Sequence, residues 1–201
     1  MTGRVELGLQ AGQAQSDEEL LQRYGAGEAE AARQITARFL PRVFTHALRL
    51  LGGDRAEAED LAQEAMLRLW RMAPEWRAGE AKVSTWLYRV VANLAVDRLR
   101  KRRGGMAALE DVAEPLDDGP SAHEAMAEGQ RLAALHRALG ELPERQREAV
   151  VLRHIEGLSN PEIAEIMQIG LEAVESLTAR GNRALAAKLS GQRENLGYHG
   201  G

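Results

Sequence analysis

The sequence predicts an all-α protein of two small helical domains joined by a flexible acidic linker, with a helix-turn-helix in the second domain. Two observations support this fold class. Apolar residues recur at three- and four-residue steps through most of the 201-residue chain, which is the period of one helix face, and strand-like alternation is absent. A run of Gly, Pro and acidic residues without an apolar period separates two groups of predicted helices.

The first predicted domain spans residues 16–104 and contains four helices. Ser16 and Glu19 have the spacing of a capping residue answered three positions later, so a helix is expected to begin there. Asp54 and Glu57 repeat that spacing. Helix ends are expected at Gly52-Gly53, Pro74 and Gly104-Gly105. The face expected to be buried includes Leu20, Leu21, Tyr24, Ile35, Phe39, Val43, Ala47 and Leu50.

The second predicted domain spans residues 125–190. Its expected helices lie near 125–140, 144–156, 160–167 and 171–189, and Ser159 with Glu162 caps the third. The last two helices have helix-turn-helix proportions. The residues expected to fill the angle between them are Ile163, Ala164, Met167, Ile169, Val174 and Leu177. Two packed helices of any helical domain would show the same period, so this motif alone leaves DNA binding open.

Between the domains lies the predicted linker, residues 105–124. From Gly104 to Gln130 there are seven acidic residues and no Lys or Arg, a composition that favours a solvated, flexible segment. The N-terminal residues 1–15 are expected to be disordered and residues 191–201 to form a tail, because both are rich in Gly and polar residues.

Composition excludes several classes of function. The chain has no Cys, which rules out disulfides and thiolate chemistry and fits a reducing compartment. No apolar run approaches the roughly 20 residues of a membrane span, and the start lacks signal-peptide order, so we expect a cytoplasmic protein with no membrane insertion of its own. Neither a catalytic motif nor metal-ligand spacing is present, so we expect no enzyme activity and no cofactor or metal.

The helix predicted from Ser84 to Arg103 is the most cationic part of the chain. Residues 82–103 hold seven basic residues and one acid, Asp97. A helix dipole explains two or three terminal cations, and this cluster exceeds that number, which favours contact with nucleic acid or an acidic protein over a merely solvated helix end. Trp86 and Tyr88 are able to stack on unpaired bases, although core packing is the favoured interpretation for Trp86.

Two other helices present polar faces. The helix over 54–70 is acidic at its start, and it either docks a basic helical partner or is simply solvated. In the last helix, Arg and Asn side chains match guanine and adenine edges in the major groove. Its residues expected to face solvent are Glu172, Glu175, Ser176, Ala179, Arg180, Asn182 and Arg183.

Three segments in this order resemble the extracytoplasmic-function (group IV) sigma factors of bacterial RNA polymerase. They are AEAEDLAQEAMLRLW (56–70), VSTWLYRVVANLAVDRLRKRR (83–103) and ALGELPERQREAVVLRHIEGLSNPEIAEIMQIGLEAVESLTARGNRAL (138–185). The resemblance extends over nearly all of 16–189. It implies a factor that binds core RNA polymerase at the beta-prime clamp helices and beta flap and directs promoter-specific initiation. A stress or environmental role, and restraint by an anti-sigma factor, are further implications.

The resemblance also implies roles for individual residues. Those matching the core polymerase contacts are Asp60, Gln63 and Glu64. Those matching the surface that binds the minus-ten element are Arg89, Asn93, Arg98, Arg100, Lys101, Arg102 and Arg103, and Asn93 would lie beside the pocket for a flipped base. Those on the helix matching minus-thirty-five recognition are Glu172, Glu175, Ser176, Thr178, Ala179, Arg180 and Arg183.

The chain departs from the family pattern at a few positions. Gln168 stands at the usual turn glycine, and Val83 stands where an aromatic residue is frequent. Glu175 and Leu177 occupy positions where basic residues are common, which leaves the recognition helix nearly neutral. We therefore expect the free protein to bind DNA weakly.

Two other functions fit parts of the sequence. An autonomous helix-turn-helix regulator would use the second domain on operator DNA, but it would leave the cationic cluster and WLYRVVAN without a role. A sigma mimic that sequesters an anti-sigma factor would be expected to lose its DNA-facing cations, and this chain retains Arg98 to Arg103.

Overall fold

The computed structural model describes residues 15–77, 79, 81–104 and 122–193 of the chain. Within these ranges every regular element is a helix, as the sequence predicts. Residues 105–121 of the predicted linker lie outside the described residues, as do most of the predicted N-terminal segment and the last eight residues of the predicted tail.

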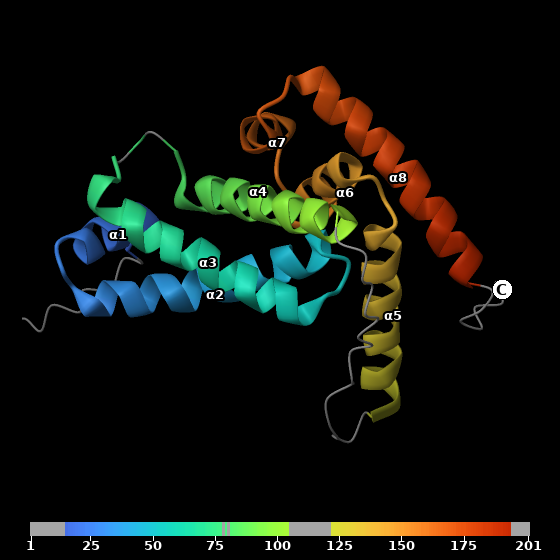
Figure 1. The fold of residues 1–201 in the computed structure, drawn as a ribbon, viewed down its shortest axis with the longest axis horizontal. Helices are drawn as coiled ribbons and strands as arrows, with labels where there is room; N and C mark the ends of the chain where they lie inside the picture. The colour runs from blue at the N-terminus through green and yellow to red at the C-terminus, as the bar shows by residue number, and fades with distance from the viewer. Residues whose placement is uncertain (1–14, 78, 80, 105–121, 194–201) are drawn as a thin grey trace, which may run out of the picture.

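The described part of the first domain consists of helices and one short 3-10 turn, arranged as Figure 1 shows. They are α1 (Asp17–Gly25), α2 (Ala29–Leu50), α3 (Arg55–Met72), η1 (Ala73–Glu75) and α4 (Val83–Gly104). The predicted starts are confirmed: Ser16 and Glu19 form a reciprocal capping box, and Asp54 accepts from the Glu57 N–H at 3.1 Å. Helix α2 contacts α1, α3 and α4, and its predicted apolar face is buried against them.

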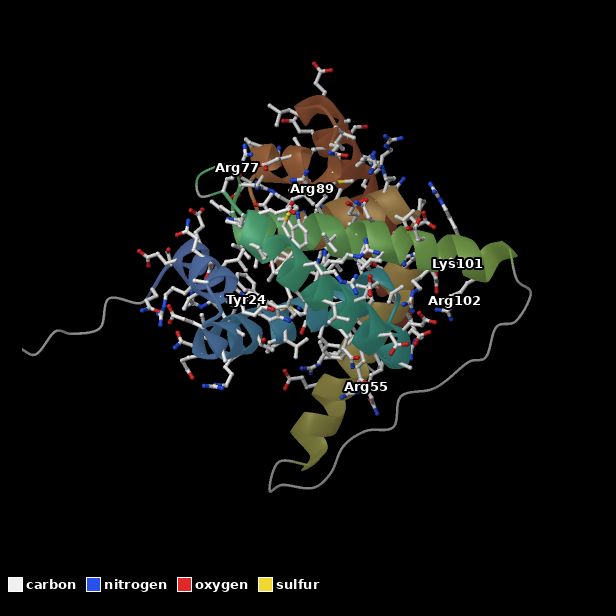
Figure 2. The ribbon with its side chains drawn as sticks, turned by 60° about the vertical axis from the view of Figure 1, so that its left-hand side comes forward. Tyr24, Arg55, Arg77, Arg89, Lys101 and Arg102 are labelled. Atoms are coloured by element: carbon white, nitrogen blue, oxygen red, sulfur yellow. The ribbon has the colours of Figure 1, made fainter. Side chains whose placement is uncertain are left out.

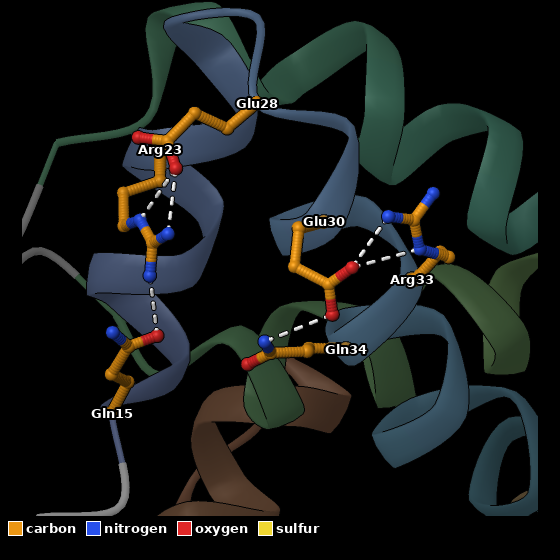
Figure 3. A network of polar contacts seen from close by, with 6 residues as sticks. All are labelled: Gln15, Arg23, Glu28, Glu30, Arg33 and Gln34. Carbon is orange, nitrogen blue, oxygen red and sulfur yellow. Dashed lines mark hydrogen bonds and ion pairs between the residues drawn. The ribbon is translucent and has the colours of Figure 1, made fainter.

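An ionic network ties α1 to the start of α2 (Figure 3). Arg23 donates to Glu28 through Nε at 3.0 Å and Nη2 at 2.6 Å, and its Nη1 bonds Gln15 at 2.6 Å. One turn further, Glu30 accepts from Arg33 and Gln34. These groups are largely exposed, so the network fixes the α1–α2 turn more than it adds stability.

The second domain follows the predicted helices closely. Its elements are α5 (Ala122–Gly140), α6 (Glu144–Val150), the π-helical turn η2 (Val151–Ile155), α7 (Asn160–Met167) and α8 (Leu171–Arg193). Ser159 and Glu162 form the predicted capping box. Ile163, Met167 and Val174 are buried between α7 and α8, and Ala164, Ile169 and Leu177 pack partly buried against them. The helix-turn-helix interior is thus confirmed.

The segment 144–156 differs from the single α-helix expected. After Val150 it winds as a π-turn, in which the Glu156 N–H bonds the Val151 carbonyl at 3.0 Å, five residues back. Such turns inside helices often occur at functional positions because they re-aim the side chains that follow. Here the side chain that follows is Glu156.

The turn between α7 and α8 contains a left-handed residue. Gln168 has φ 53° and ψ 51°, and its N–H bonds the Ala164 carbonyl. This conformation is normally supplied by glycine, since a Cβ costs about 1–2 kcal/mol there. The turn therefore keeps its geometry although the sequence has no glycine at this position.

The two domains pack directly against each other. Helix α4 contacts α7, and α2 contacts α5 and α6. At the boundary the backbones of Gly52 and Gly140 meet so closely that a Cβ added to Gly52 would lie 3.1 Å from the Gly140 Cα. The hydrophobic core continues across the boundary, from the first domain to Leu139, Leu142, Val150 and Val151.

Candidate polymerase and nucleic-acid interfaces

The cationic end of α4 lies against the acidic start of α3. Arg98 forms an ion pair with Glu57, and Arg102 Nη1 bonds Asp54 Oδ2 at 2.9 Å. The acidic side chains at the N-terminus of α3 thus neutralise the basic side chains at the C-terminus of α4. Each set also suits the dipole of its own helix. Arg100 and Lys101 are exposed, and Lys101 extends from the end of α4 in Figure 2. The side chain of Arg103 lies outside the described residues.

Further along α4, Arg89 and Asn93 share one helix face, four residues apart. Asn93 is exposed, whereas Arg89 is partly buried and its Nη2 lies 4.0 Å from Glu165 Oε1 of α7. At the start of the helix, Lys82 Nζ bonds Glu162 Oε1 at 2.9 Å. This bond from Lys82, together with the bonds from Ser159, lowers the pKa of Glu162 to about 2. Lys82, which directly precedes α4, and Arg89 within it therefore face the second domain.

The aromatic residues of α4 have structural partners. Trp86 packs partly buried on the first-domain core and meets Trp76 edge-to-face at 6.3 Å, which confirms the interpretation as core packing. Tyr88 is 9% exposed and belongs to the hydrophobic cluster of the helix-turn-helix. In this arrangement Tyr88 cannot stack on a base.

The polar face of α3 carries the residues predicted to contact polymerase. Asp60 and Gln63 are exposed, and the partly buried Glu64 accepts from Arg68 at 2.8 Å. Leu67 lies on the same face, one turn from Gln63, and is 49% exposed. The sequence analysis did not single out Leu67. Its spacing could have indicated it, because an apolar residue four positions after Gln63 and three after Glu64 falls on the same polar helix face. The face thus combines carboxylates with one uncovered apolar side chain.

Helix α8, which is the expected recognition helix, presents most of its predicted residues to solvent. Those exposed are Glu172, Glu175, Ser176, Ala179, Arg180 and Arg183. Thr178 differs, because its hydroxyl is buried and has no hydrogen-bond partner among the described residues. Asn182 is engaged by His154, whose Nε2 lies 2.8 Å from the amide nitrogen.

The described helices do not include one with both the length and the apolar character of a membrane span. Nor do the described ranges bring together three His, Asp or Glu side chains that could hold a metal ion.

A helix-turn-helix joined to a second helical domain, which has a cationic helix end and an exposed acidic helix face, is typical of a helical transcription factor. Two family models match the chain, Sigma-70 region 2 over residues 35–104 and Sigma-70, region 4 over residues 132–185. The chain belongs to the sigma-70 family, as a sigma factor of the extracytoplasmic-function type. Proteins of this family are transcription initiation factors and not enzymes.

Individual relatives agree with this membership. The chain is 30% identical to the ECF RNA polymerase sigma factor SigW of Bacillus subtilis, over 81% of this chain and 91% of that protein. It is 34% identical to SigM of Mycobacterium tuberculosis, over 87% of this chain and 85% of that protein. The solved structure of CnrH in complex with the cytosolic domain of CnrY matches with a TM-score of 0.66 at 25% identity, covering 88% of this chain and 99% of that one.

Proposed function

We propose that this sigma factor binds core RNA polymerase through the exposed face of α3. The observation that supports it is the uncovered Leu67 beside Asp60, Gln63 and Glu64. An apolar anchor surrounded by carboxylates suits a basic, partly apolar helical partner such as the beta-prime clamp helices. The second domain, residues 125–190, would contact the beta flap.

The two promoter elements are assigned to different domains. The domain over 16–104 would open the minus-ten element through Asn93 and the exposed cations Arg100 and Lys101 of α4. The same DNA-binding surface would include four further cations, Arg89, Arg98, Arg102 and Arg103. The first three now pair with carboxylates and would exchange them for DNA phosphates. The minus-thirty-five element would be read by the exposed residues of α8, with Thr178 reaching DNA only if its side chain rotates outward.

Regulation is proposed by analogy with solved relatives. CnrH is seen with the cytosolic domain of CnrY, and RpoE of Bartonella quintana is seen with the anti-sigma factor NepR. We propose that this chain is likewise restrained by an anti-sigma factor and released in a stress or environmental response. It would act in the cytoplasm, where bacterial RNA polymerase works.

Run-off transcription with sigma-free core polymerase and a promoter library tests these assignments. The Arg100→Ala/Lys101→Ala chain is expected to keep core binding and lose most transcripts, because it removes phosphate contacts only. The Gln63→Ala/Leu67→Asp chain is expected to lose core binding in co-purification. Arg23→Ala/Arg33→Ala, which removes two cations of the α1–α2 network (Figure 3), is the control and should transcribe normally.

The outcomes separate the alternatives. Specific transcripts that depend on Arg100 and Lys101 would support the sigma-factor assignment. Absence of both core binding and transcripts would favour an autonomous helix-turn-helix regulator or a sigma mimic.

A further inference from the structure

The first turn of α8 carries an apolar side chain that is exposed to solvent. Leu171, the first residue of the helix, is 50% exposed. The buried side of the same turn is formed by Val174, which belongs to the helix-turn-helix core. Figure 1 shows this end of α8 at the outer edge of the molecule. Leu171 therefore lies outside that core, on the side of α8 turned to solvent.

One turn further along, Glu175 is an exposed carboxylate without an ion pair among the described residues. It lies four residues after Leu171, so the two side chains are neighbours on one helix face. Ala179, four residues further, is also exposed and is small enough to let this face approach another surface closely. The dipole of α8 favours Glu172 in the first turn, but its effect falls off within that turn and gives Glu175 no comparable role.

The major groove offers a carboxylate few partners. In a helix-turn-helix, the first residues of the recognition helix meet the base edges there. A carboxylate is repelled by the phosphates and by the acceptor atoms of guanine and thymine, whereas it accepts a hydrogen bond from the N4 amino group of cytosine. Adenine also has an amino group, at N6, but the N7 acceptor beside it repels a carboxylate. A glutamate in the position of Glu175 therefore favours cytosine over the other three bases.

The same groove offers an exposed leucine one kind of partner. Thymine carries a methyl group on its major-groove edge, and apolar side chains contact that methyl. Leu171 presents such a side chain on the same helix face as Glu175. Four helical residues rise about 6 Å and successive base pairs lie about 3.4 Å apart, so the two side chains reach bases that are one or two pairs apart.

We propose that Leu171 and Glu175 determine which minus-thirty-five sequence this chain selects. Glu175 accepts a hydrogen bond from cytosine N4, and Leu171 packs on the methyl group of a thymine one or two base pairs away. This inference rests on the proposed role of α8 and adds Leu171 to its DNA-facing residues. Arg180 and Arg183, exposed further along the helix, are available for phosphates, whose contacts position a helix without selecting a sequence. Glu175 thus lowers affinity for duplexes in general and raises the preference for those with the cytosine.

The test uses polymerase assembled from core enzyme and the full chain, with promoters randomised over the minus-thirty-five element. Sequencing of the promoters that the polymerase retains gives the base preference at each position. The natural chain should enrich cytosine at one position and thymine one or two pairs away. Each preference should be about tenfold, which is the order of affinity lost through one mismatched base pair.

Two substitutions assign the preferences to their residues. Glu175→Gln should replace the preference for cytosine by one for adenine at the same position, because a glutamine amide pairs with adenine N6 and N7. Leu171→Ser should lose the preference for thymine and keep that for cytosine. Glu141→Gln makes the same chemical change in an ion pair with Lys188, near the other end of α8, and should alter neither preference. Far-UV circular dichroism confirms that each variant is folded.

Uracil in place of the selected thymine removes only the methyl group. It should weaken promoter retention by the natural chain several-fold and have no effect on retention by Leu171→Ser. Equal losses in the two proteins, or a cytosine preference that persists in Glu175→Gln, would overturn the proposal.

The same library, offered as short duplexes to the full chain without polymerase at low salt, separates this inference from the proposed function. Selection of the cytosine and thymine by the free chain without any transcription would support the base contacts and count against the proposed function. Promoter-specific transcription with the same minus-thirty-five preferences in the natural chain and both variants would count against the base contacts alone.

Discussion

The guanidinium of Arg147 in α6 donates a hydrogen bond to the carbonyl of Leu50 at the end of α2. It also bonds the carbonyls of Gly140 at 2.8 Å and Leu142 at 3.1 Å. Carbonyls in the last turn of a helix lack intrahelical partners and favour a nearby cation. A side chain of the second domain thus completes a helix end of the first, in a position only 3% exposed.

We therefore expect Arg147→Ala to be strongly destabilising, by about 3 kcal/mol or more, because it leaves three carbonyls without this donor. Urea unfolding followed by circular dichroism measures the change. Arg145→Ala is the matched control: its side chain is 52% exposed, and its loss should cost less than about 1 kcal/mol. Equal effects of the two substitutions would contradict the role given to Arg147.

Gly181 is required by the crossing of α8 over α6. A Cβ at this position would lie 2.5 Å from Val150 Cγ2 and 3.0 Å from the Gln146 carbonyl oxygen. Gly181→Ala should therefore destabilise the protein by about 1–3 kcal/mol. Gly129→Ala, at a helical site with open space around it, should instead stabilise by up to about 1 kcal/mol. Thermal unfolding of both variants would show opposite shifts of Tm.

The burial of Glu148 leads us to expect that the stability of the protein depends on pH. It lies in a narrow cavity lined by Ala92, Ala95, Val96 and Leu99 of α4, and burial raises its pKa to about 7, although Arg145 opposes the shift. The unfolded chain releases this proton near pH 4.5, so the contribution is complete below that pH and is lost as pH rises towards 7.

By this linkage, about 3 kcal/mol of stability disappears between pH 4.5 and 7. Glu148→Gln, which stays neutral, should flatten the decline and raise Tm at pH 8 relative to the natural chain. Unfolding curves recorded across this pH range provide the measurement. A parallel decline in both proteins would show that other groups control it.

The charge of the exposed face of α8 leads us to expect that the free protein binds duplex DNA weakly. Glu172 and Glu175 are exposed beside Arg180 and Arg183, so the face is nearly neutral. Glu175→Lys should tighten duplex binding and steepen its salt dependence, because one repulsive charge becomes a phosphate contact. Fluorescence anisotropy over a salt series checks this, with Ala186→Lys on the same helix as the control. Tight, sequence-specific binding by the natural chain at physiological salt would refute the prediction.

The parts of the fold that follow from neighbouring residues were predictable. The Ser16 and Ser159 capping boxes and the glycines after α2 act over three or four positions, so a local pattern suffices to find them. Of the candidate sites, the exposure of Asp60, Gln63 and most of α8 agrees with the amphipathic pattern.

Contacts between distant segments were not predictable. Glu156 and Arg147 look like ordinary helix charges in the sequence, and Tyr88 looks like an exposed aromatic residue, because each contacts residues of the other domain that are distant in the sequence. The pairs Arg98 with Glu57 and Arg102 with Asp54 join residues more than forty positions apart. The burial of the Thr178 hydroxyl depends on the packing of α8 against other elements, which residue spacing alone does not give.

The π-turn at Val151–Ile155 has an evolutionary consequence. A π-turn amounts to one extra residue within an α-helix, and one residue rotates the helix by about 100°. Glu156 follows the turn and accepts from Arg49 Nη1 at 2.8 Å, and its Oε1 lies 3.3 Å from His46 Nδ1. Deleting a single codon in this segment should therefore turn Glu156 away from these two residues and lower the free energy of unfolding, which urea unfolding would reveal. The strength of the domain contact is thus open to change by an insertion or deletion of one residue, without any change to the exposed residues of α8.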